Sequence, residues 1–327
     1  LPLPARVVAA PRDLPVSAPI ELTGLHKRFG DVRALDGLDL TVRRGTVCAI
    51  LGHNGAGKTT TLRTLLGLVR PDAGTVRVLG DDPLRDGRRV RARVGVVLDR
   101  DGLYERLSAE ANLDYHARLH GLAGRRRRAA VEAGLRRFGL WQRRRERIAG
   151  WSTGQRKQLA LARALLHEPE LLLLDEPFAG LDPVAATEVR ALLAGLARDG
   201  DRTVVLTTHD LAHVERACDH VVVAERGRVL AQGSLGELRA QADELTVLVR
   251  GAGLTDALLD RLRDDGVVLD HVRVDDGVRV RCPATGRPRL AAALVGAGVA
   301  LEELRPCGAS LEDLFLALVA GRDAEAA

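Results

Sequence analysis

A glycine-rich stretch between two differently patterned segments constrains the fold most strongly. Residues 52–59, Gly-His-Asn-Gly-Ala-Gly-Lys-Thr, match the pattern G-x-x-x-x-G-K-[ST]. The apolar run Val47–Leu51 before them predicts a buried strand, and the spacing of Thr60–Leu68 after them predicts a helix. A strand that leads into a helix through such a loop is typical of α/β proteins with a parallel sheet.

The same loop predicts a polyphosphate site. Its glycines let backbone N–H groups surround phosphate oxygens, and the start of the following helix adds a favourable dipole. Lys58 is suited to the β and γ phosphates, and the Thr59 hydroxyl to Mg²⁺. Lysine is rare in this chain, which has only Lys27, Lys58 and Lys157 among its many arginines. The predicted phosphate-binding residues are Gly52, His53, Asn54, Gly55, Ala56, Gly57, Lys58, Thr59 and Thr60.

A second constraint comes from residues 171–176. Leu171–Leu174 is short and wholly apolar, as expected for a strand buried on both faces of a parallel sheet. This strand delivers Asp175 and Glu176 at its carboxyl end, where ligands bind in such sheets. We therefore expect the two acids to lie near the phosphate loop.

The 327-residue length predicts two domains. The proline-rich residues 1–19 are expected to be a flexible leader, and residues 20–240 the first domain. Alternating apolar positions in Ile20–Leu25 and Leu38–Val42, with Thr75–Leu79, predict a small antiparallel sheet beside the phosphate loop.

Helical spacing follows that sheet. It indicates a helical insert from about residue 105, with the helical subdomain ending at about residue 167. Alternating strand and helix patterns then return as far as residue 224, which predicts a parallel α/β core.

Residues 244–320 show a separate pattern. From Leu245 to Arg305 the order is strand, helix, two strands, helix and strand, followed by a final helix. This order is typical of a ferredoxin-like α+β unit. It contains no catalytic cluster, so we expect an accessory structural or regulatory domain.

Composition excludes several other classes of protein. No apolar stretch reaches the roughly 18 to 20 residues that span a bilayer, and residues 1–19 lack the apolar segment of a signal peptide. The four cysteines show no C-x-x-C pair and are interpreted as buried thiols in a reducing compartment. The chain is thus expected to be soluble and cytoplasmic.

Charge is a weak signal here. The formal net charge is +5, and acids and bases alternate over most of the length. Arg125–Arg128 and Arg143–Arg147 are interpreted as solvated helix faces, with contact to a partner or to lipid as the alternative. Aromatic residues make up 2% of the chain, so base stacking on nucleic acid is not expected.

Together with Thr208-His209 after a strand pattern, these motifs resemble the nucleotide-binding subunits of ATP-binding cassette (ABC) proteins over about residues 20–240. The resemblance implies a P-loop NTPase cassette with a parallel core sheet, an antiparallel β subdomain and a helical subdomain. It implies ATP and Mg²⁺ as cofactors and ATP hydrolysis as the reaction.

The resemblance also implies residue roles within one cassette. Asp175 matches the acid associated with Mg²⁺, Glu176 the base that polarises the attacking water, and His209 the sensor of the γ-phosphate. Phe29 stands where the family stacks an aromatic ring on adenine, a core phenylalanine being the alternative. Asp99 replaces the glutamine that touches Mg²⁺ and the water, so it is expected to bind the metal as a shorter, charged side chain.

Further residues are implied to serve a second copy of the chain. Trp151-Ser152-Thr153-Gly154-Gln155 stands where the family has LSGGQ, at the start of a helix. By this resemblance Ser152, Gly154 and Gln155 contact ATP held on the partner of a head-to-tail dimer, and Asp182 resembles a dimer-contacting residue. The alternative for Ser152 is an ordinary helix N-cap.

Three segments resemble the drug-export and multidrug-resistance branch of the family: Gly102–Ser108, Gly233–Leu235 and Ser310–Phe315. They imply export of a hydrophobic, drug-like compound through a separate membrane permease, with this chain on the inner face of the membrane. A soluble cassette protein acting on ribosomes or nucleic acid is the alternative, although such proteins usually have two cassettes or a long coiled coil. A non-hydrolysing regulatory protein is a third hypothesis, motivated by Asp99.

Overall fold

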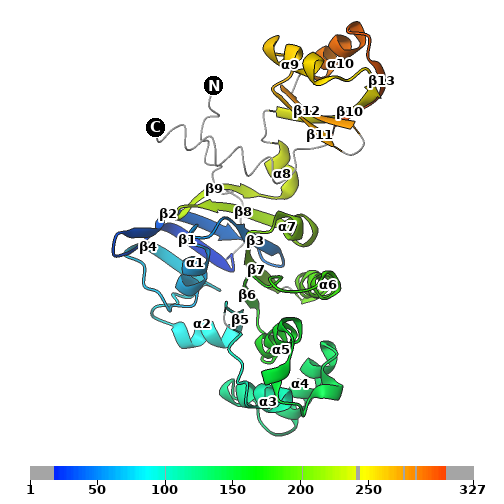
Figure 1. The fold of residues 1–327 in the computed structure, drawn as a ribbon. Coiled ribbons are helices and arrows are strands. Elements are labelled where there is room, and N and C mark those ends of the chain that lie inside the picture. Colours follow the sequence, from blue (N-terminus) through cyan, green and yellow to red (C-terminus); the bar gives the residue numbers. More distant parts are fainter. Residues whose placement is uncertain are drawn as a thin grey trace. The chain divides into compact units, whose positions relative to one another are not determined.

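The computed structural model describes residues 18–99, 101–200, 202–240, 244–274, 277–283 and 286–306. Most of the proposed leader, Cys307, the segment Ser310–Phe315 and the expected final helix lie outside these residues. The chain divides into two compact units, with the boundary between Gln232 and Gly233. Figure 1 follows the chain through both.

A six-stranded sheet forms the centre of the first unit. Its strand order is β5-β6-β7-β3-β8-β9, and β5, β6, β7, β3 and β8 pair in parallel. The strands β3, β6 and β7 are buried along their whole length, which explains their continuous apolar runs. The bounds are β3 Val47–Leu51, β5 Val94–Val97, β6 Leu171–Asp175, β7 Thr203–Thr208, β8 His220–Glu225 and β9 Arg228–Gly233.

A second, antiparallel sheet has the order β2-β1-β4, as the alternation predicted. Its strands are β1 Ile20–Phe29, β2 Val32–Val42 and β4 Ala73–Val78. Apolar residues of this sheet, such as Ile20 and Leu38, share one core cluster with Ile50 and Val205 of the central sheet. Helix α1, Lys58–Leu65, begins inside the glycine-rich loop and belongs to the same cluster, which fixes the loop between the two sheets.

The expected helical insert is present. It comprises α3 Ala109–Leu119, α4 Gly124–Arg137, the short 3-10 helices η1 Trp141–Arg143 and η2 Ile148–Gly150, and α5 Thr153–Leu165. These elements have their own core, which includes Leu113, Leu135, Ile148 and Leu159. In Figure 1 they gather beyond the β5 edge of the central sheet, and α5 contacts β5 directly.

Three other helices complete the first unit: α2 Gly87–Arg93, α6 Pro183–Gly200 and α7 Leu211–Ala217. The sequence patterns predicted α6 and α7 but not α2, nor the strands β5 and β9. Strand β9 is joined to β8 by Arg226 and Gly227, both with positive φ, the conformation of a type I′ hairpin turn.

The second unit has the predicted ferredoxin-like order. Its sheet runs β11-β12-β10-β13, and all three pairs are antiparallel. Leu259, Leu290 and Leu294 of its helices share a core with Val247 and Val280 of the sheet. The bounds are α8 Leu235–Ala240, β10 Glu244–Ala252, α9 Asp256–Asp264, β11 Asp270–Val274, β12 Gly277–Pro283, α10 Arg287–Gly296 and β13 Ala300–Pro306.

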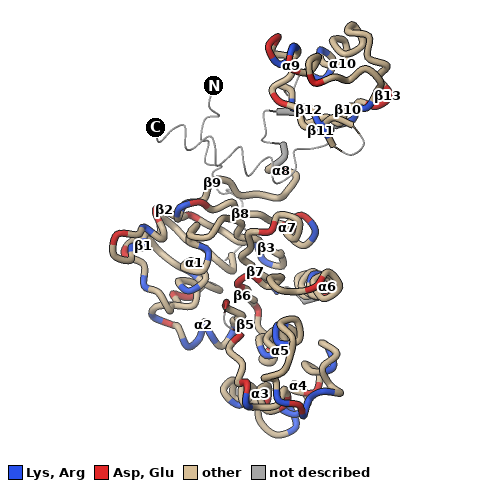
Figure 2. Tube along the Cα trace, viewed as in Figure 1, with Lys and Arg blue, Asp and Glu red and all other residues tan. Residues whose placement is uncertain are grey.

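The arginine runs lie on the helical insert and are partly paired with acids. Arg127 contacts Asp114 at 2.7 Å, and Arg143 contacts Glu146 at 2.7 Å. Figure 2 shows basic and acidic positions together on α3, α4 and α9. Surface pairs of this kind contribute little to stability, so they are consistent with solvated faces.

The described part of the chain bears on two further expectations. Cys48 and Cys282 are buried and Cys218 is partly buried, all as free thiols, and burial raises the pKa of Cys218 to about 12. Among the residues that the structure describes, no helix combines the length and apolar character that a bilayer span requires.

Candidate functional site

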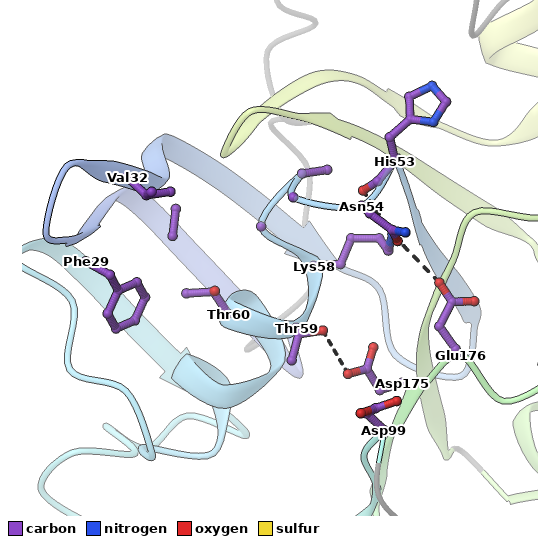
Figure 3. A pocket seen from close by; sticks show the side chains of 14 residues that line it. Phe29, Val32, His53, Asn54, Lys58, Thr59, Thr60, Asp99, Asp175 and Glu176 are labelled. Atoms are coloured by element: carbon purple, nitrogen blue, oxygen red, sulfur yellow. Dashed lines mark hydrogen bonds and ion pairs between the residues drawn. The ribbon is translucent and has the colours of Figure 1, made fainter.

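A cavity of about 430 Å³ lies over the glycine-rich loop. Figure 3 shows that its walls come from the antiparallel sheet on one side and from the ends of β5 and β6 on the other. The lining residues are Phe29, Val32, Ala34, His53, Asn54, Gly55, Ala56, Gly57, Lys58, Thr59, Thr60, Asp99, Asp175 and Glu176. Most of the residues predicted for one cassette thus meet at one place.

Two positions of the loop require glycine because neighbouring backbone approaches closely. A Cβ atom at Gly52 would lie 2.3 Å from the Ala224 carbonyl oxygen. Gly57 has a φ of +95°, and a Cβ atom there would lie 2.5 Å from the Ala34 carbonyl oxygen. The loop is therefore pressed onto β2 and onto the end of β8. Gly52 itself does not line the cavity, but its carbonyl oxygen contacts Lys58, which does.

Lys58 places a buried positive charge inside the loop. Its Nζ donates to the carbonyl oxygens of Gly52, at 2.6 Å, and of His53, at 3.2 Å. The same Nζ lies 3.7 Å from Glu176 Oε1. Only 7% of the lysine side chain is exposed, so its charge is directed into the cavity rather than into bulk solvent.

Three oxygen-bearing side chains, those of Thr59, Asp99 and Asp175, line the cavity close to one another. The Thr59 hydroxyl donates to Asp175 Oδ2 at 2.9 Å, and the Thr207 hydroxyl donates to Asp175 Oδ1. Asp99 lies at the end of β5, which pairs with β6 and so brings Asp99 beside Asp175 (Figure 3). Hydroxyl and carboxylate oxygens are suitable Mg²⁺ ligands.

The arrangement fits a magnesium ion that is shared with a phosphate ligand. Within the described residues no three His, Cys, Asp or Glu side chains form a group that could enclose a metal. Mg²⁺ is commonly bound through one or two carboxylates together with substrate phosphates. Thr59, Asp99 and Asp175 are therefore suited to a metal that arrives with a nucleotide.

Glu176 is held in an unusual backbone conformation. Its φ is +46°, a left-handed value that costs a non-glycine residue roughly 1–2 kcal/mol. Its N–H donates to the Thr207 carbonyl oxygen and hydroxyl, and its carbonyl oxygen accepts from Lys157 Nζ at 2.8 Å. His209 Nδ1 lies 2.9 Å from Glu176 Oε1. The carboxylate thus stands between Lys58 and His209, although His209 itself does not line the cavity.

An exposed aromatic ring forms the far end of the cavity. Phe29 is 50% exposed, and Lys27 Nζ lies 5.3 Å from the centre of its ring. Val32 and Ala34 of β2 complete this apolar wall (Figure 3). An exposed ring can stack on a planar base, whereas a core phenylalanine would be buried.

The signature-like residues form a different local structure. Ser152 caps α5 by accepting from Gln155 N–H at 3.3 Å, and Gln155 Oε1 accepts from Ser152 N–H at 3.2 Å. This is a capping box. Asp182 likewise accepts from the N–H groups of Val184 and Ala185 at the start of α6.

The signature residues Ser152, Gly154 and Gln155, and Asp182, are not part of the cavity of their own chain. Gly154 lies against Leu181, and a Cβ atom at Gly180 would lie 3.0 Å from Thr153. The first residues of α5 and the segment before α6 therefore lie against each other, away from the loop.

Sequence reasoning missed four residues of the site. Val32 and Ala34 follow Phe29 closely, but only the pairing of β1 with β2 puts them in the same wall. Thr207 stands two residues before His209. A hydroxyl at that position was the sequence feature that could have identified it. Lys157 carried a signal too, because it is a lone lysine among arginines.

Comparison with known proteins shows similarity along most of the chain. A family described as "ABC transporter" matches residues 35–179. The daunorubicin resistance ATP-binding protein DrrA3 of Streptomyces coeruleorubidus is 40% identical over 91% of this chain and 95% of its own length. The bacitracin transport ATP-binding protein BcrA of Bacillus licheniformis is 31% identical over 94% of this chain and 99% of its own.

A solved structure has a similar fold. It is an ATP-binding cassette bound to ADP and Pi in a dimeric, post-hydrolysis state. It superposes with a TM-score of 0.60 at 26% identity, over 66% of this chain and 98% of its own.

Proposed function

Because the chain belongs to the ABC transporter family, as an ATP-hydrolysing subunit, we propose that the cavity above the glycine-rich loop is its ATP site. The observation that carries this proposal is the position of the Glu176 carboxylate. It lies 3.7 Å from Lys58 Nζ and 2.9 Å from His209 Nδ1, at the edge of the phosphate loop. A base at this position can act on a water that approaches the terminal phosphate.

Each residue around Glu176 has a distinct role in this proposal. Lys58 contacts the β and γ phosphates and gives up its carbonyl contacts within the loop as they arrive. His209 contacts the γ-phosphate and holds the Glu176 carboxylate in place. Thr59, Asp175 and Asp99 bind Mg²⁺, which neutralises phosphate charge during phosphoryl transfer.

The apolar end of the cavity is proposed to hold the adenine. Phe29 offers a ring face, and Val32 offers an aliphatic contact beside it. Such a surface favours a planar base without demanding particular hydrogen bonds, so affinity there comes mainly from stacking.

A second copy of the chain is proposed to complete each site. Ser152, Gly154, Gln155 and Asp182 do not line the cavity of their own chain, and Ser152 is exposed at the start of α5. The N-terminus of a 13-residue helix is a suitable partner for phosphate. In a head-to-tail dimer, this end of one copy would cover the ATP on Lys58 of the other.

The proposed task is export of a hydrophobic, drug-like compound through a separate membrane permease. Two relatives that match nearly the whole chain are named for daunorubicin resistance and for bacitracin transport. We place the chain at the inner face of the cell membrane, docked on that permease. Residues 20–240 would be the ATPase domain and residues 244–320 an accessory domain.

Substitution of Glu176 tests the catalytic assignment. A purified Glu176→Gln chain should bind Mg·ATP as the unaltered chain does, because Lys58 and Thr59 remain. Its phosphate release should be slower by roughly 10²–10⁴-fold, the contribution of a positioned general base. Glu188→Gln, on the exposed face of α6, is the matched control and should hydrolyse ATP normally. Near-normal phosphate release from Glu176→Gln would refute the role of Glu176.

A further inference from the structure

Helix α5 contacts the backbone of Glu176 and the segment that follows β5. From one side of the helix, Lys157 Nζ donates to the Glu176 carbonyl oxygen at 2.8 Å. Its neighbour Arg156 contacts Asp101 Oδ2 at 2.8 Å and Glu105 Oε1 at 2.7 Å. Both side chains follow Ser152 by little more than one turn. The start of α5 is therefore connected to the segments on either side of the cavity.

Further along the helix, Arg163 strengthens the same connection. It donates to the carbonyl oxygens of Val96, at 2.8 Å, and Gly102, at 3.1 Å. These carbonyls flank Asp99, so α5 binds both ends of the segment that carries it. Displacement of α5 would consequently displace this segment together with Glu176.

The backbone of Glu176 is held by Lys157 together with other contacts. Strand β7 holds the Glu176 N–H through Thr207, and Ala179 N–H also donates to the Glu176 carbonyl oxygen, at 3.2 Å. Because φ of Glu176 is +46°, its strained backbone conformation persists only while the surrounding contacts hold it. The contact from Lys157 is the one that connects this backbone to the helical insert.

Burial and the nearby carboxylates act in opposite directions on the charge of Lys157. Burial lowers the pKa of the Lys157 ammonium, and the carboxylates of Asp175 and Glu176 act against this shift. A charged donor to a carbonyl oxygen forms a stronger hydrogen bond than a neutral one.

We propose that Lys157 is a positioning residue that couples the phosphate-facing start of α5 to the base Glu176 of the same chain. The proposal rests on the function proposed above. When the start of α5 binds ATP held on the partner, the helix shifts as a rigid unit together with Lys157. Through its contact with the Glu176 carbonyl oxygen, Lys157 then places the Glu176 carboxylate in the position for catalysis. Hydrolysis at one site then depends on contact made at the other.

Steady-state kinetics of three variants test this role. Lys157→Met should lower kcat about 10-fold or more while leaving KM and the Kd for Mg·ATP within about 2-fold, since misplacement of a reacting group affects rate rather than binding. Lys157→Arg should recover part of the lost kcat because it keeps a charged donor. Arg118→Ala removes an exposed pair with Asp114 elsewhere in the insert, and should match the unaltered chain. An unchanged kcat in Lys157→Met would overturn the proposal.

A double-mutant cycle separates positioning from a general loss of structure. In a Glu176→Gln background, Lys157→Met should change the residual rate by less than about 2-fold, because Lys157 acts through Glu176. Loss of the full single-variant factor in that background would overturn the proposal. If Lys157→Met melts below the assay temperature, Lys157→Gln replaces it under the same criteria.

ATP hydrolysis by the unaltered chain distinguishes failure of the proposed function from failure of the role of Lys157. If it fails to hydrolyse Mg·ATP, the proposed function is wrong and the role of Lys157 fails with it. If it hydrolyses Mg·ATP and Lys157→Met does so equally fast, only the role of Lys157 is refuted.

Discussion

At the scale of residues, Asp99 adds a carboxylate to the proposed metal site. It is exposed, two residues after the end of β5, and lies beside the buried Asp175 in the same cavity wall. A third oxygen ligand of this charge should strengthen Mg²⁺ binding by attraction.

We expect Asp99→Asn to raise the Mg²⁺ concentration for half-maximal ATPase activity several-fold, with maximal activity restored at high Mg²⁺. Titration of activity with Mg²⁺ at fixed ATP measures this. Asp265→Asn, an exposed substitution in the second unit, is the control. Identical Mg²⁺ curves for Asp99→Asn and the unaltered chain would show that Asp99 does not bind the metal.

Gly57 combines a left-handed backbone with a close neighbour, and the two effects can be measured separately. Gly121 has a φ of +75° but open space where its Cβ would stand, whereas a Cβ at Gly57 would lie 2.5 Å from backbone. Gly121→Ala should thus cost about 1 kcal/mol, the penalty for backbone strain alone.

Gly57→Ala should destabilise the chain by at least about 1 kcal/mol more than Gly121→Ala, and should also weaken ATP binding. Chemical denaturation and nucleotide titration measure the two effects. Equal destabilisation by both substitutions would mean that the loop moves away from β2 at no cost.

At the scale of residues, the sequence was informative wherever a fixed spacing carries the chemistry. Lys58, Thr59 and Asp175 follow from local patterns, because a loop and one strand position them. Thr207 and Lys157 were not predicted, since their contacts with residues 175 and 176 depend on how β7 and α5 pack.

At the scale of elements, α3 and the end of α5 form a histidine cluster beside β5. The rings of His120 and His167 stack with centroids 3.7 Å apart, and His167 Nε2 lies 3.2 Å from the Val94 carbonyl oxygen. Burial lowers the pKa of His116 and of His167 to about 4, and lowers that of His120 as well, with Arg163 also disfavouring charge on His116 and His120.

The sign of the pH effect follows from these shifts. An unfolded histidine has a pKa of about 6.5, so below this pH the unfolded chain binds protons that the folded chain does not. The stability that the neutral rings contribute is complete above about pH 6.5, and is lost as the pH falls toward about 4.

The melting temperature of the unaltered chain should therefore drop between pH 7.5 and pH 5. In His167→Phe, which keeps a ring beside His120, this drop should be smaller. His26→Gln, at an exposed histidine, should leave it unchanged. Thermal unfolding at both pH values checks the prediction, and an equal drop in all three chains would contradict it.

Long, uniformly patterned elements were predictable, and short ones were not. Leu171–Leu174 was recognisable because burial on both faces leaves no polar position. Strand β5 was not recognised because it contains Gly95, whose missing side chain makes room for α5: a Cβ there would lie 2.3 Å from the Ala164 carbonyl oxygen. Packing against α5, rather than the strand preference of its residues, determines that this segment forms a strand.

At the scale of the whole molecule, the proposed head-to-tail dimer predicts how the oligomeric state depends on nucleotide. Glu176→Gln with Mg·ATP should sediment as a dimer, because ATP stays bound between two copies, whereas with ADP it should sediment as a monomer. Adding Ser152→Glu should return it to a monomer, since a carboxylate would face phosphate, while ATP binding continues. Sedimentation velocity measures these states. A monomer in all conditions would refute the head-to-tail arrangement.

The chain has three lysines, and all of them belong to the proposed ATP site or contact a residue of it. Lys27 lies over Phe29, Lys58 lies within the loop, and Lys157 holds the peptide of Glu176. Every other permanently charged basic side chain is an arginine, which resists acylation near neutral pH because it stays protonated. Among side chains, amine-directed labelling would therefore address this site alone.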